Sequence, residues 1–307
     1  MRKFFIKSLF LIPLLLFLCY MEFGLGKIPN SYSYKRENLE KQLDSIQVLI
    51  LGSSQAAHGI NPSCFALKTY NLSNISQSIY YDSKITVKYL DKMPKLKYAV
   101  INLPYISFGY QIIDGIESWR DYYYSQFWDI NYPEIETFNL KRYSKIFLYT
   151  PERAISYSLQ GFKADLIKDY KANGYVPYDT LNNYKNISDS LGLKRVKLHD
   201  SFYKEKRWAE NQNYLQQLIE ELQKRNIQVV LVTQPVFATY SKFVNKAKLK
   251  KTTDTINLIC KKYNCKYLNY FTDNRFSKSD FYDNDHLNCI GADKFSKILN
   301  NDMSGQK

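Results

Sequence analysis

Short apolar runs alternate along the chain with longer segments in which apolar residues recur at helical spacing. The short runs, bounded by Gly, Pro or Asn, are typical of buried strands. They lie at residues 46–51, 69–72, 97–102, 227–233 and 266–270. The segments with helical spacing lie at residues 80–93, 215–222, 245–263 and 291–300. Strands that alternate with helices predict an α/β domain over residues 46–307, with a mainly parallel sheet covered by helices on both faces.

Residues from about 105 to 207 interrupt this alternation, because they hold aromatic clusters and many turn residues but no strong strand signal. We interpret them as an insertion, largely helical and irregular, that packs over the sheet edge. Two interpretations of its aromatic residues, among them Trp119 and Trp128, stay open. They line a groove for a sugar or an acyl chain, or they form a small core of the insertion itself.

The N-terminus combines a basic start with an almost entirely apolar stretch. This pattern is typical of a signal segment or a short membrane anchor, so residues 1–26 are predicted to meet the lipid bilayer through residues 8–25. Because basic flanks stay in the cytoplasm, the main domain is expected outside it, periplasmic or outward-facing. Residues 27–45 are predicted to form a stalk and a short helix. A buried core helix is the alternative for the apolar stretch.

The formal net charge of +14 predicts attraction to polyanions. No nucleic-acid-binding module is recognisable and the lysines are scattered, so nucleic acid is not an expected partner. The N-terminal stretch favours membrane surfaces or acidic envelope polymers, although the lysines can equally serve only to solvate the surface. Cys260 and Cys265 match no zinc motif. Either these two cysteines form a disulfide, or three or more of the five cysteines are free, buried thiols.

Two segments at opposite ends of the chain carry the candidate chemistry. Residues 52–54, Gly-Ser-Ser, directly follow the first predicted strand. Residues 283–288, Asp-Asn-Asp-His-Leu-Asn, lie just ahead of the last predicted helix. In parallel α/β sheets, functional sites lie beyond the carboxyl ends of the strands. Because the chain has only three histidines, few other general bases are available.

A serine hydroxyl becomes a nucleophile when a base takes its proton and an acid orients that base. Ser54 is the predicted nucleophile, with Ser53 as the alternative on the same turn. His286 is the predicted base. Asp283, three residues before it, is the predicted orienting acid, and Asp285 is the lesser candidate. The two segments therefore predict a Ser-His-Asp site.

These motifs resemble those of the SGNH/GDSL hydrolase superfamily, in which the nucleophilic Ser lies in a Gly-Asp-Ser motif and Asp-x-x-His precedes the last helix. Gly52-Ser53-Ser54 matches with Ser in place of Asp, and Asp283 and His286 match the second motif. The following residues 58–62, His-Gly-Ile-Asn-Pro, resemble membrane-anchored envelope proteins of this kind, including the D-alanyl transfer proteins of teichoic acid. The resemblance implies a three-layer, flavodoxin-like α/β fold.

The resemblance also implies an oxyanion hole, which the family builds from a Gly amide and an Asn side chain. Here Ser73 stands where the Gly is expected, followed by Asn74, and Asn102 ends the third predicted strand. Together with the amide of Ser54, these residues are the predicted donors. Each donor matters, because losing one typically slows acyl transfer by about a hundredfold or more.

The activity implied is that of an extracytoplasmic serine esterase or O-acyltransferase on acetyl-like esters of a cell-envelope glycan. Its partners would be the acylated glycan or an acyl donor. The sequence does not identify any protein partner. Gln55 and His58 are predicted to line the pocket. The chemistry requires no metal and no cofactor. The alternative is a catalytically weak or inactive protein of the same fold that binds or scaffolds envelope polysaccharide.

Overall fold

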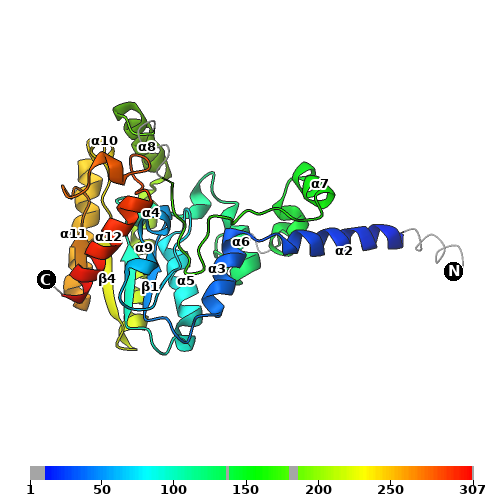
Figure 1. Ribbon diagram of the computed structural model, residues 1–307, viewed down its shortest axis with the longest axis horizontal. Helices are drawn as coiled ribbons and strands as arrows, with labels where there is room; N and C mark the ends of the chain where they lie inside the picture. Colours follow the sequence, from blue (N-terminus) through cyan, green and yellow to red (C-terminus); the bar gives the residue numbers. More distant parts are fainter. Residues whose placement is uncertain (1–10, 136–137, 180–185, 306–307) are drawn as a thin grey trace, which may run out of the picture. The chain divides into compact units, whose positions relative to one another are not determined.

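The computed structural model describes residues 11–135, 138–179 and 186–305 (Figure 1). The chain divides into two compact units, which we describe separately. Unit 1 comprises residues 1–36 and 119–168, and unit 2 comprises residues 37–118 and 169–307. The first ten residues of the predicted anchor lie outside the described residues.

Unit 2 is built on a five-stranded sheet in which every neighbouring pair is parallel. Its strands, in spatial order, are β2 (Thr69–Asn71), β1 (Val48–Leu51), β3 (Tyr98–Asn102), β4 (Gln228–Thr233) and β5 (Lys266–Asn269). All five predicted strands are present, and the parallel α/β fold is confirmed. The order β2-β1-β3-β4-β5 is that of flavodoxin-like sheets, in which ligands bind where the strand order reverses.

One face of the sheet is covered by α4 (Ser54–Gly59) and α12 (Cys289–Ser304), which contact each other. Phe295 and Leu299 of α12 join Val48, Ile50 and Val100 in one buried cluster. The alternate strand residues point to the opposite face and are buried as well. Helices α5 (Ile79–Tyr89), α9 (Trp208–Gln223) and α11 (Lys246–Tyr263) complete the α/β alternation, with α5 packed on α9.

The described part of the predicted insertion contains helices and turns but no strand, as expected. It is not one body, however, because residues 119–168 belong to unit 1 and the remainder belongs to unit 2. Unit 2 also holds α8, α10 and short 3₁₀ helices. These are α8 (Asp189–Phe202), α10 (Ala238–Ser241), η1 (Pro62–Cys64), η2 (Leu90–Lys92), η3 (Ser107–Gly109), η4 (Ile112–Asp114), η7 (Glu205–Arg207) and η8 (Lys278–Asp280).

Unit 1 joins the N-terminal helix to the middle of the chain. Its elements are α2 (Leu11–Lys27), the start of α3 (Ser31–Glu40), α6 (Arg120–Trp128), η5 (Leu140–Arg142), η6 (Lys145–Leu148) and α7 (Pro151–Leu159). Tyr124 and Trp128 are buried in it, which favours the interpretation of the aromatic residues as a core; Trp119 remains 43% exposed.

The segment predicted as a stalk contains the expected short helix, α3, but it is packed rather than solvated. Ile28, Tyr32 and Lys35 are each at most 2% exposed. Among the described residues, no single helix is long and apolar enough to cross a membrane; α2 and α3, bent by 64° at their junction, meet the length and composition criteria only as a pair. Cys260 and Cys265 are free thiols with their sulfur atoms 3.2 Å apart.

Candidate active site

The turn that presents Ser54 depends on Gly52. Gly52 has a φ of +133°, and a Cβ atom there would lie 2.9 Å from Asn102 Cβ and 3.0 Å from Asn102 O. Glycine alone meets both conditions without strain. After it, Ser53 is the N-cap of α4 and Ser54 is the first helical residue. The chain therefore reverses within two residues of the end of β1.

A buried carboxyl group on α5, that of Asp82, holds this turn in place by a hydrogen bond. Asp82 Oδ1 accepts hydrogen bonds from the Gly52 amide at 3.0 Å and from Gln77 Nε2 at 2.6 Å. Burial raises the pKa of Asp82 to about 7, although both hydrogen bonds act in the opposite direction. Asp82 therefore connects α5 to the turn at Gly52, although it lies in no sequence motif that would indicate this role.

The loop before α12 folds around the carboxylate of Asp283. Asp283 Oδ1 accepts hydrogen bonds from the amides of Asp285 at 3.0 Å and His286 at 2.8 Å. Phe281 and Leu287 pair as an isolated antiparallel bridge, which closes the loop. His286 Nδ1 lies 3.0 and 3.1 Å from the two oxygens of Asp283. This arrangement places the ring proton on Nδ1 and leaves Nε2 as an acceptor.

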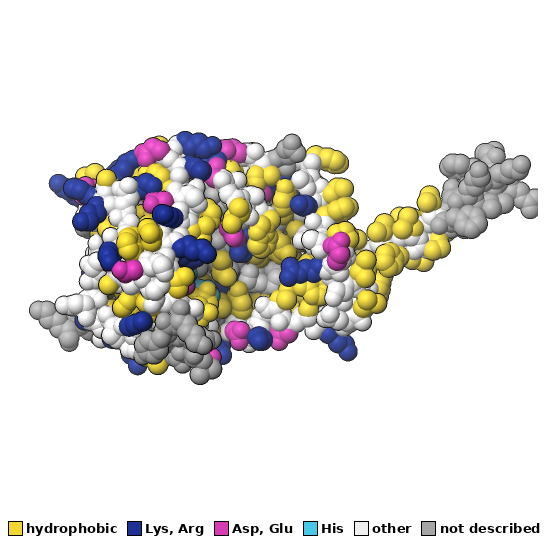
Figure 2. All heavy atoms as spheres, turned by 90° about the horizontal axis from the view of Figure 1, so that it is seen from above, with side chains coloured by type: hydrophobic (Ala, Val, Ile, Leu, Met, Phe, Trp, Pro, Cys, Tyr) yellow, Lys and Arg dark blue, Asp and Glu magenta, His cyan; other side chains and the backbone are white. Residues whose placement is uncertain are grey.

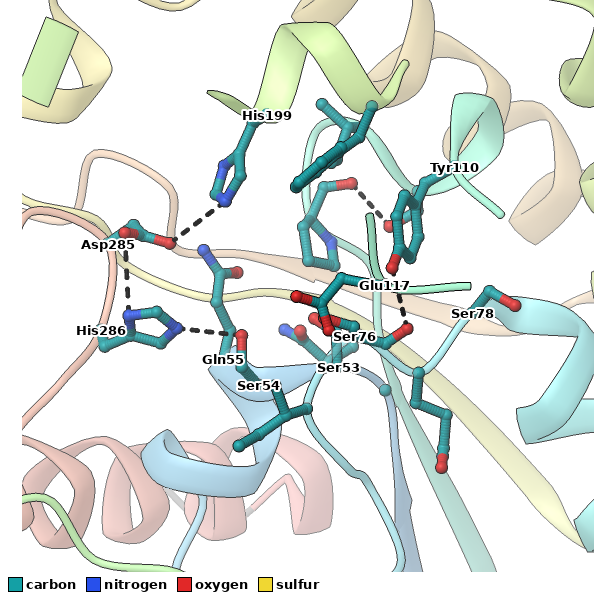
Figure 3. A pocket seen from close by; sticks show the side chains of 18 of the residues that line it. Ser53, Ser54, Gln55, Ser76, Ser78, Tyr110, Glu117, His199, Asp285 and His286 are labelled. Atoms are coloured by element: carbon teal, nitrogen blue, oxygen red, sulfur yellow. Dashed lines mark hydrogen bonds and ion pairs between the residues drawn. The ribbon is translucent and has the colours of Figure 1, made fainter. Parts of the chain in front are cut away.

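The structure brings Ser54 and His286 together across 232 positions of sequence, with Ser54 Oγ 2.9 Å from His286 Nε2 (Figure 3). Hydrogen bonds thus connect Asp283 to His286 and His286 to Ser54, which forms a continuous proton relay. Asp285 Oδ1 is farther from Nδ1, at 3.7 Å. Ser53 lines the same pocket, but no hydrogen bond of the described structure joins it to His286. The geometry is that of an activated serine.

Burial and charge act against each other on this relay. Burial by itself lowers the pKa of His286, but the carboxylates of Asp283 and Asp285 outweigh it and raise the pKa above its ordinary 6.5. Burial likewise opposes ionisation of Asp283, but the neighbouring His286 holds the pKa of that carboxyl well below its usual range. His286 therefore accepts a proton readily, while Asp283 keeps its charge.

Two residues of α8 extend the site, and the sequence analysis missed both. Arg195 forms an ion pair with the buried carboxylate of Asp285, in which Nε lies 2.8 Å from Oδ1 and Nη2 lies 3.4 Å from Oδ2. His199 lines the pocket and faces Asp285 from the side opposite His286, with Nε2 3.8 Å from Oδ2 (Figure 3). Burial lowers the pKa of His199 to about 4, so its ring is neutral at neutral pH.

The predicted oxyanion donors divide into two groups. Ser54 and Asn102 line the pocket. The amide of Ser73 instead donates to Asn71 Oδ1 at 3.2 Å, and the amide of Asn74 donates to Gly52 O at 3.2 Å. Because those two amides are already engaged away from the pocket, we revise the donor set to exclude them.

The two remaining donors, the Asn102 side chain and the Ser54 amide, are not committed to strong hydrogen bonds within their own elements. The donor group of Asn102, Nδ2, makes only a long contact of 3.5 Å to Val232 O. As the first residue of α4, Ser54 has no carbonyl within the helix to accept from its amide. Of the four predicted donors, these two are the ones that lie at the pocket.

The pocket around Ser54 has a volume of about 280 Å³. Gln55 lines it. His58 does not; its Nδ1 donates to Val176 O at 2.8 Å and its ring stacks on Tyr178 with the centroids 3.7 Å apart. Tyr178 in turn meets the ring of His286 edge-on, so His58 supports the pocket wall from behind.

A metal is the other species that this loop could hold, since ligand atoms of Asp283, Asp285 and His286 lie within 4.8 Å of one another. The donor set fits a proton relay better. Asp283 already accepts from two amides and from His286 Nδ1, and Asp285 is paired with Arg195. The ring nitrogen of His286 that faces these carboxylates is Nδ1, which carries the ring proton, whereas the bare Nε2 faces Ser54.

Comparisons with known proteins add little to this geometry. One family model, which carries no functional description, matches residues 181–306, less than half of the chain. No curated protein matches the sequence.

Several solved structures are similar over most of this chain. A candidate acylhydrolase from Bacteroides fragilis is 9% identical with a TM-score of 0.43 and covers 89% of this chain and 94% of its own. A GDSL-like lipase from Bacteroides thetaiotaomicron is 11% identical with a TM-score of 0.42, over 91% and 100%. A candidate platelet activating factor from Streptococcus pneumonia is 11% identical with a TM-score of 0.45, over 96% and 99%. At these values the likenesses decide neither fold nor activity, which rest on the chain's own topology and geometry.

Proposed function

We propose that this protein is a serine-dependent acyl-ester hydrolase or O-acyltransferase. The observation that carries the proposal is the relay in which Ser54 Oγ lies 2.9 Å from His286 Nε2 and His286 Nδ1 lies 3.0 Å from Asp283 Oδ2. A serine so placed can attack an acyl carbon because the histidine takes its proton as the new bond forms.

The reaction proceeds in two steps. Ser54 Oγ bonds to the acyl carbon, His286 Nε2 takes the hydroxyl proton, and Asp283 stabilises the resulting imidazolium. Asn102 Nδ2 and the Ser54 amide face the developing oxyanion. His286 then returns the proton to the leaving alcohol. In the second step His286 Nε2 takes the proton of water or of a sugar hydroxyl, whose oxygen bonds to the acyl carbon. The bond from that carbon to Ser54 Oγ then breaks, and His286 returns the proton to Oγ.

A second part of the proposal concerns the cellular location and the substrate of the enzyme. We propose that the enzyme acts outside the cytoplasm on acetyl-like esters of a cell-envelope glycan, in the manner of the envelope proteins its motifs resemble. The basic start followed by an apolar stretch supports the location, and the net charge of +14 supports an acidic polymer over a neutral small ester. Whether water or a hydroxyl is the acceptor depends on the access of water to the acyl-serine.

A fluorophosphonate probe tests the chemistry directly, because it phosphonylates an activated serine without requiring the natural substrate. We expect the full-length protein to be labelled, and Ser54→Ala to lose labelling by roughly a thousandfold or more. Ser53→Ala is the matched control, since it removes a hydroxyl from the same turn without touching the relay, and it should label normally. A folded protein that takes up no probe would instead support the binding or scaffolding alternative.

Mass spectrometry of envelope glycans tests the substrate and direction. Cells that carry Ser54→Ala are compared with cells that carry Ser53→Ala. Less O-acylation in the Ser54 variant indicates transfer to the glycan, and more indicates removal from it. Unchanged glycans, in cells whose purified protein does label, would exclude envelope glycans while leaving the serine chemistry intact.

A further inference from the structure

The N-terminal helix α2 changes its surroundings abruptly along its length. Its first described part, from Leu11 to Tyr20, is exposed throughout, with Leu16 65% and Phe17 52% accessible. From Met21 onward α2 packs against other elements of unit 1. Figure 1 shows the free part of α2 projecting beyond α7, and Figure 2 shows hydrophobic side chains along it.

The exposed apolar side chains surround α2 instead of forming one stripe. The run from residue 14 to residue 18 is Leu-Leu-Leu-Phe-Leu, and at 100° per residue these side chains point to every side of the helix. A folded protein partner would cover one face only. A hydrocarbon phase covers all faces at once, so this part of the helix matches lipid.

The point at which α2 becomes packed is fixed by hydrogen bonds. The carboxylate of Glu22 accepts from Ser144 Oγ at 2.7 Å, from the Lys145 amide at 2.9 Å and from the Ile146 amide at 3.2 Å. One turn further on, Leu25 packs in a buried cluster with Tyr157 of α7. Residues 144–157 are therefore held at the end of the apolar part of α2.

Helix α7, so held, has two apolar faces. Ala154 and Tyr157 point inward against α2. Ile155 and Leu159, one turn apart, point outward and are 55% and 84% exposed. Phe147, on the preceding η6, is 45% exposed. An outward i, i+4 pair of large aliphatic side chains is what an interfacial helix presents to a bilayer.

The charged side chains in the segment that contains α7 are mainly positive. Between residues 138 and 168, exposed or half-buried basic side chains outnumber acidic ones: Lys141, Lys145, Arg153, Lys163 and Lys168 against Glu152 and Asp165. Basic side chains beside an apolar face are attracted to anionic head groups. This excess of positive charge therefore favours binding to an anionic bilayer over a neutral one.

We propose that Ile155 and Leu159 of α7, with Phe147, form a second membrane contact that lies in the head-group region of the anionic bilayer entered by α2. Unit 1 then contacts lipid through α7 and Phe147 as well as through α2. The proposal concerns lipid contact alone and holds whether or not Ser54 is catalytic.

A fluorescent probe that reports the polarity around one side chain tests this contact even if α2 alone retains the protein on vesicles. All five cysteines are first replaced by alanine, and NBD is attached in the full-length chain at Leu159→Cys or Ile155→Cys. Leu258→Cys is the matched control, because Leu258 is a 67% exposed leucine on α11 of unit 2. Circular dichroism checks that each variant is folded.

On vesicles of phosphatidylcholine and phosphatidylglycerol, we expect blue-shifted emission at positions 159 and 155 and quenching by lipids that carry a nitroxide near the head group. High salt should reverse part of the shift. An NBD spectrum at 159 and 155 as water-like as at 258 would overturn the proposal. So would a blue shift that needs no vesicles and grows with protein concentration, since it would mean that a second copy covers the face.

Discussion

His286 shows how much of the candidate chemistry is set by single charged side chains. Its Nδ1 faces two carboxylates, Asp283 at 3.0 Å and Asp285 at 3.7 Å. Arg195 neutralises much of the second one, so the net effect on His286 is a balance of opposed charges. A base works only in its neutral form, so activity is expected to fall as the pH drops through its raised pKa.

Asp285→Asn is predicted to move the acid limb of the pH–reactivity profile to lower pH. The change removes a negative charge beside Nδ1 and leaves the positive charge of Arg195, so both effects lower the pKa of His286. A shift of about one pH unit is expected for a charge within ~4 Å. The rate of fluorophosphonate labelling, measured against pH, reports it without a known substrate.

Asp273→Asn is the matched control for that profile, because Asp273 pairs with Arg275 and does not line the Ser54 pocket. It should leave the acid limb in place. If Asp285→Asn leaves it in place as well, the second carboxylate does not act on His286. Asp283 would then be the carboxylate that acts on His286, in line with the preference that spacing gave it over Asp285 in the sequence.

At the scale of elements, the turn from β1 into α4 is constrained by several neighbouring groups. A buried strand, a glycine with φ of +133° and a helix start follow one another from Val48 to Ser54. The sequence predicts this turn well, because apolar runs and glycines are local signals. It does not predict that the turn rests against Asn102 and Asp82, which lie on other elements.

Gly52→Ala is predicted to destabilise the fold by about 1–3 kcal/mol through backbone strain, with further loss from the contact with Asn102. Because the change also displaces Ser54, labelling should slow by roughly a hundredfold. Chemical denaturation and labelling rates measure the two effects. Gly115→Ala serves as the control, since its Cβ would meet nothing closer than 3.4 Å. A Gly52 variant as stable and reactive as the Gly115 variant would contradict the prediction.

At the scale of the whole molecule, the chain does not divide where the pattern of strands and helices suggests. The pattern separates an N-terminal segment, a stalk and a domain with one insertion. In the structure, residues 119–168 of that insertion share a unit with residues 1–36. The contacts responsible join Met21 and Leu25 to Ala154 and Tyr157, more than a hundred positions away.

Removing residues 1–26 is therefore predicted to loosen the segment 144–157, whereas removing residues 1–18 is not. The longer deletion takes away Met21, Glu22 and Leu25, and each buried apolar side chain is worth about 1.5–3 kcal/mol. Hydrogen exchange should show faster exchange in 144–157 for the longer deletion only, with strands β1, β3 and β4 as the internal reference. Equal protection in both truncated proteins would show that α2 does not support unit 1.

The sequence by itself determined the features that depend on neighbours along the chain. The five strands, the helices between them, the turn at Gly52 and the loop that holds Asp283 beside His286 all follow from periodicity and short-range spacing. Their chemical roles remain predictions until the serine is tested. Ser73 and Asn74 were placed less well, because the direction of an amide depends on the exact path of a turn.

Only the tertiary structure decided which distant segments meet. Arg195 and Asp285 are 90 positions apart, and no pattern in α8 indicates that it returns to the carboxyl ends of the strands. The same holds for Glu22 and residues 144–146 in unit 1. Local propensity fixes the elements, but the free energy of burying surfaces against one another fixes their neighbours, and that is a property of the whole chain.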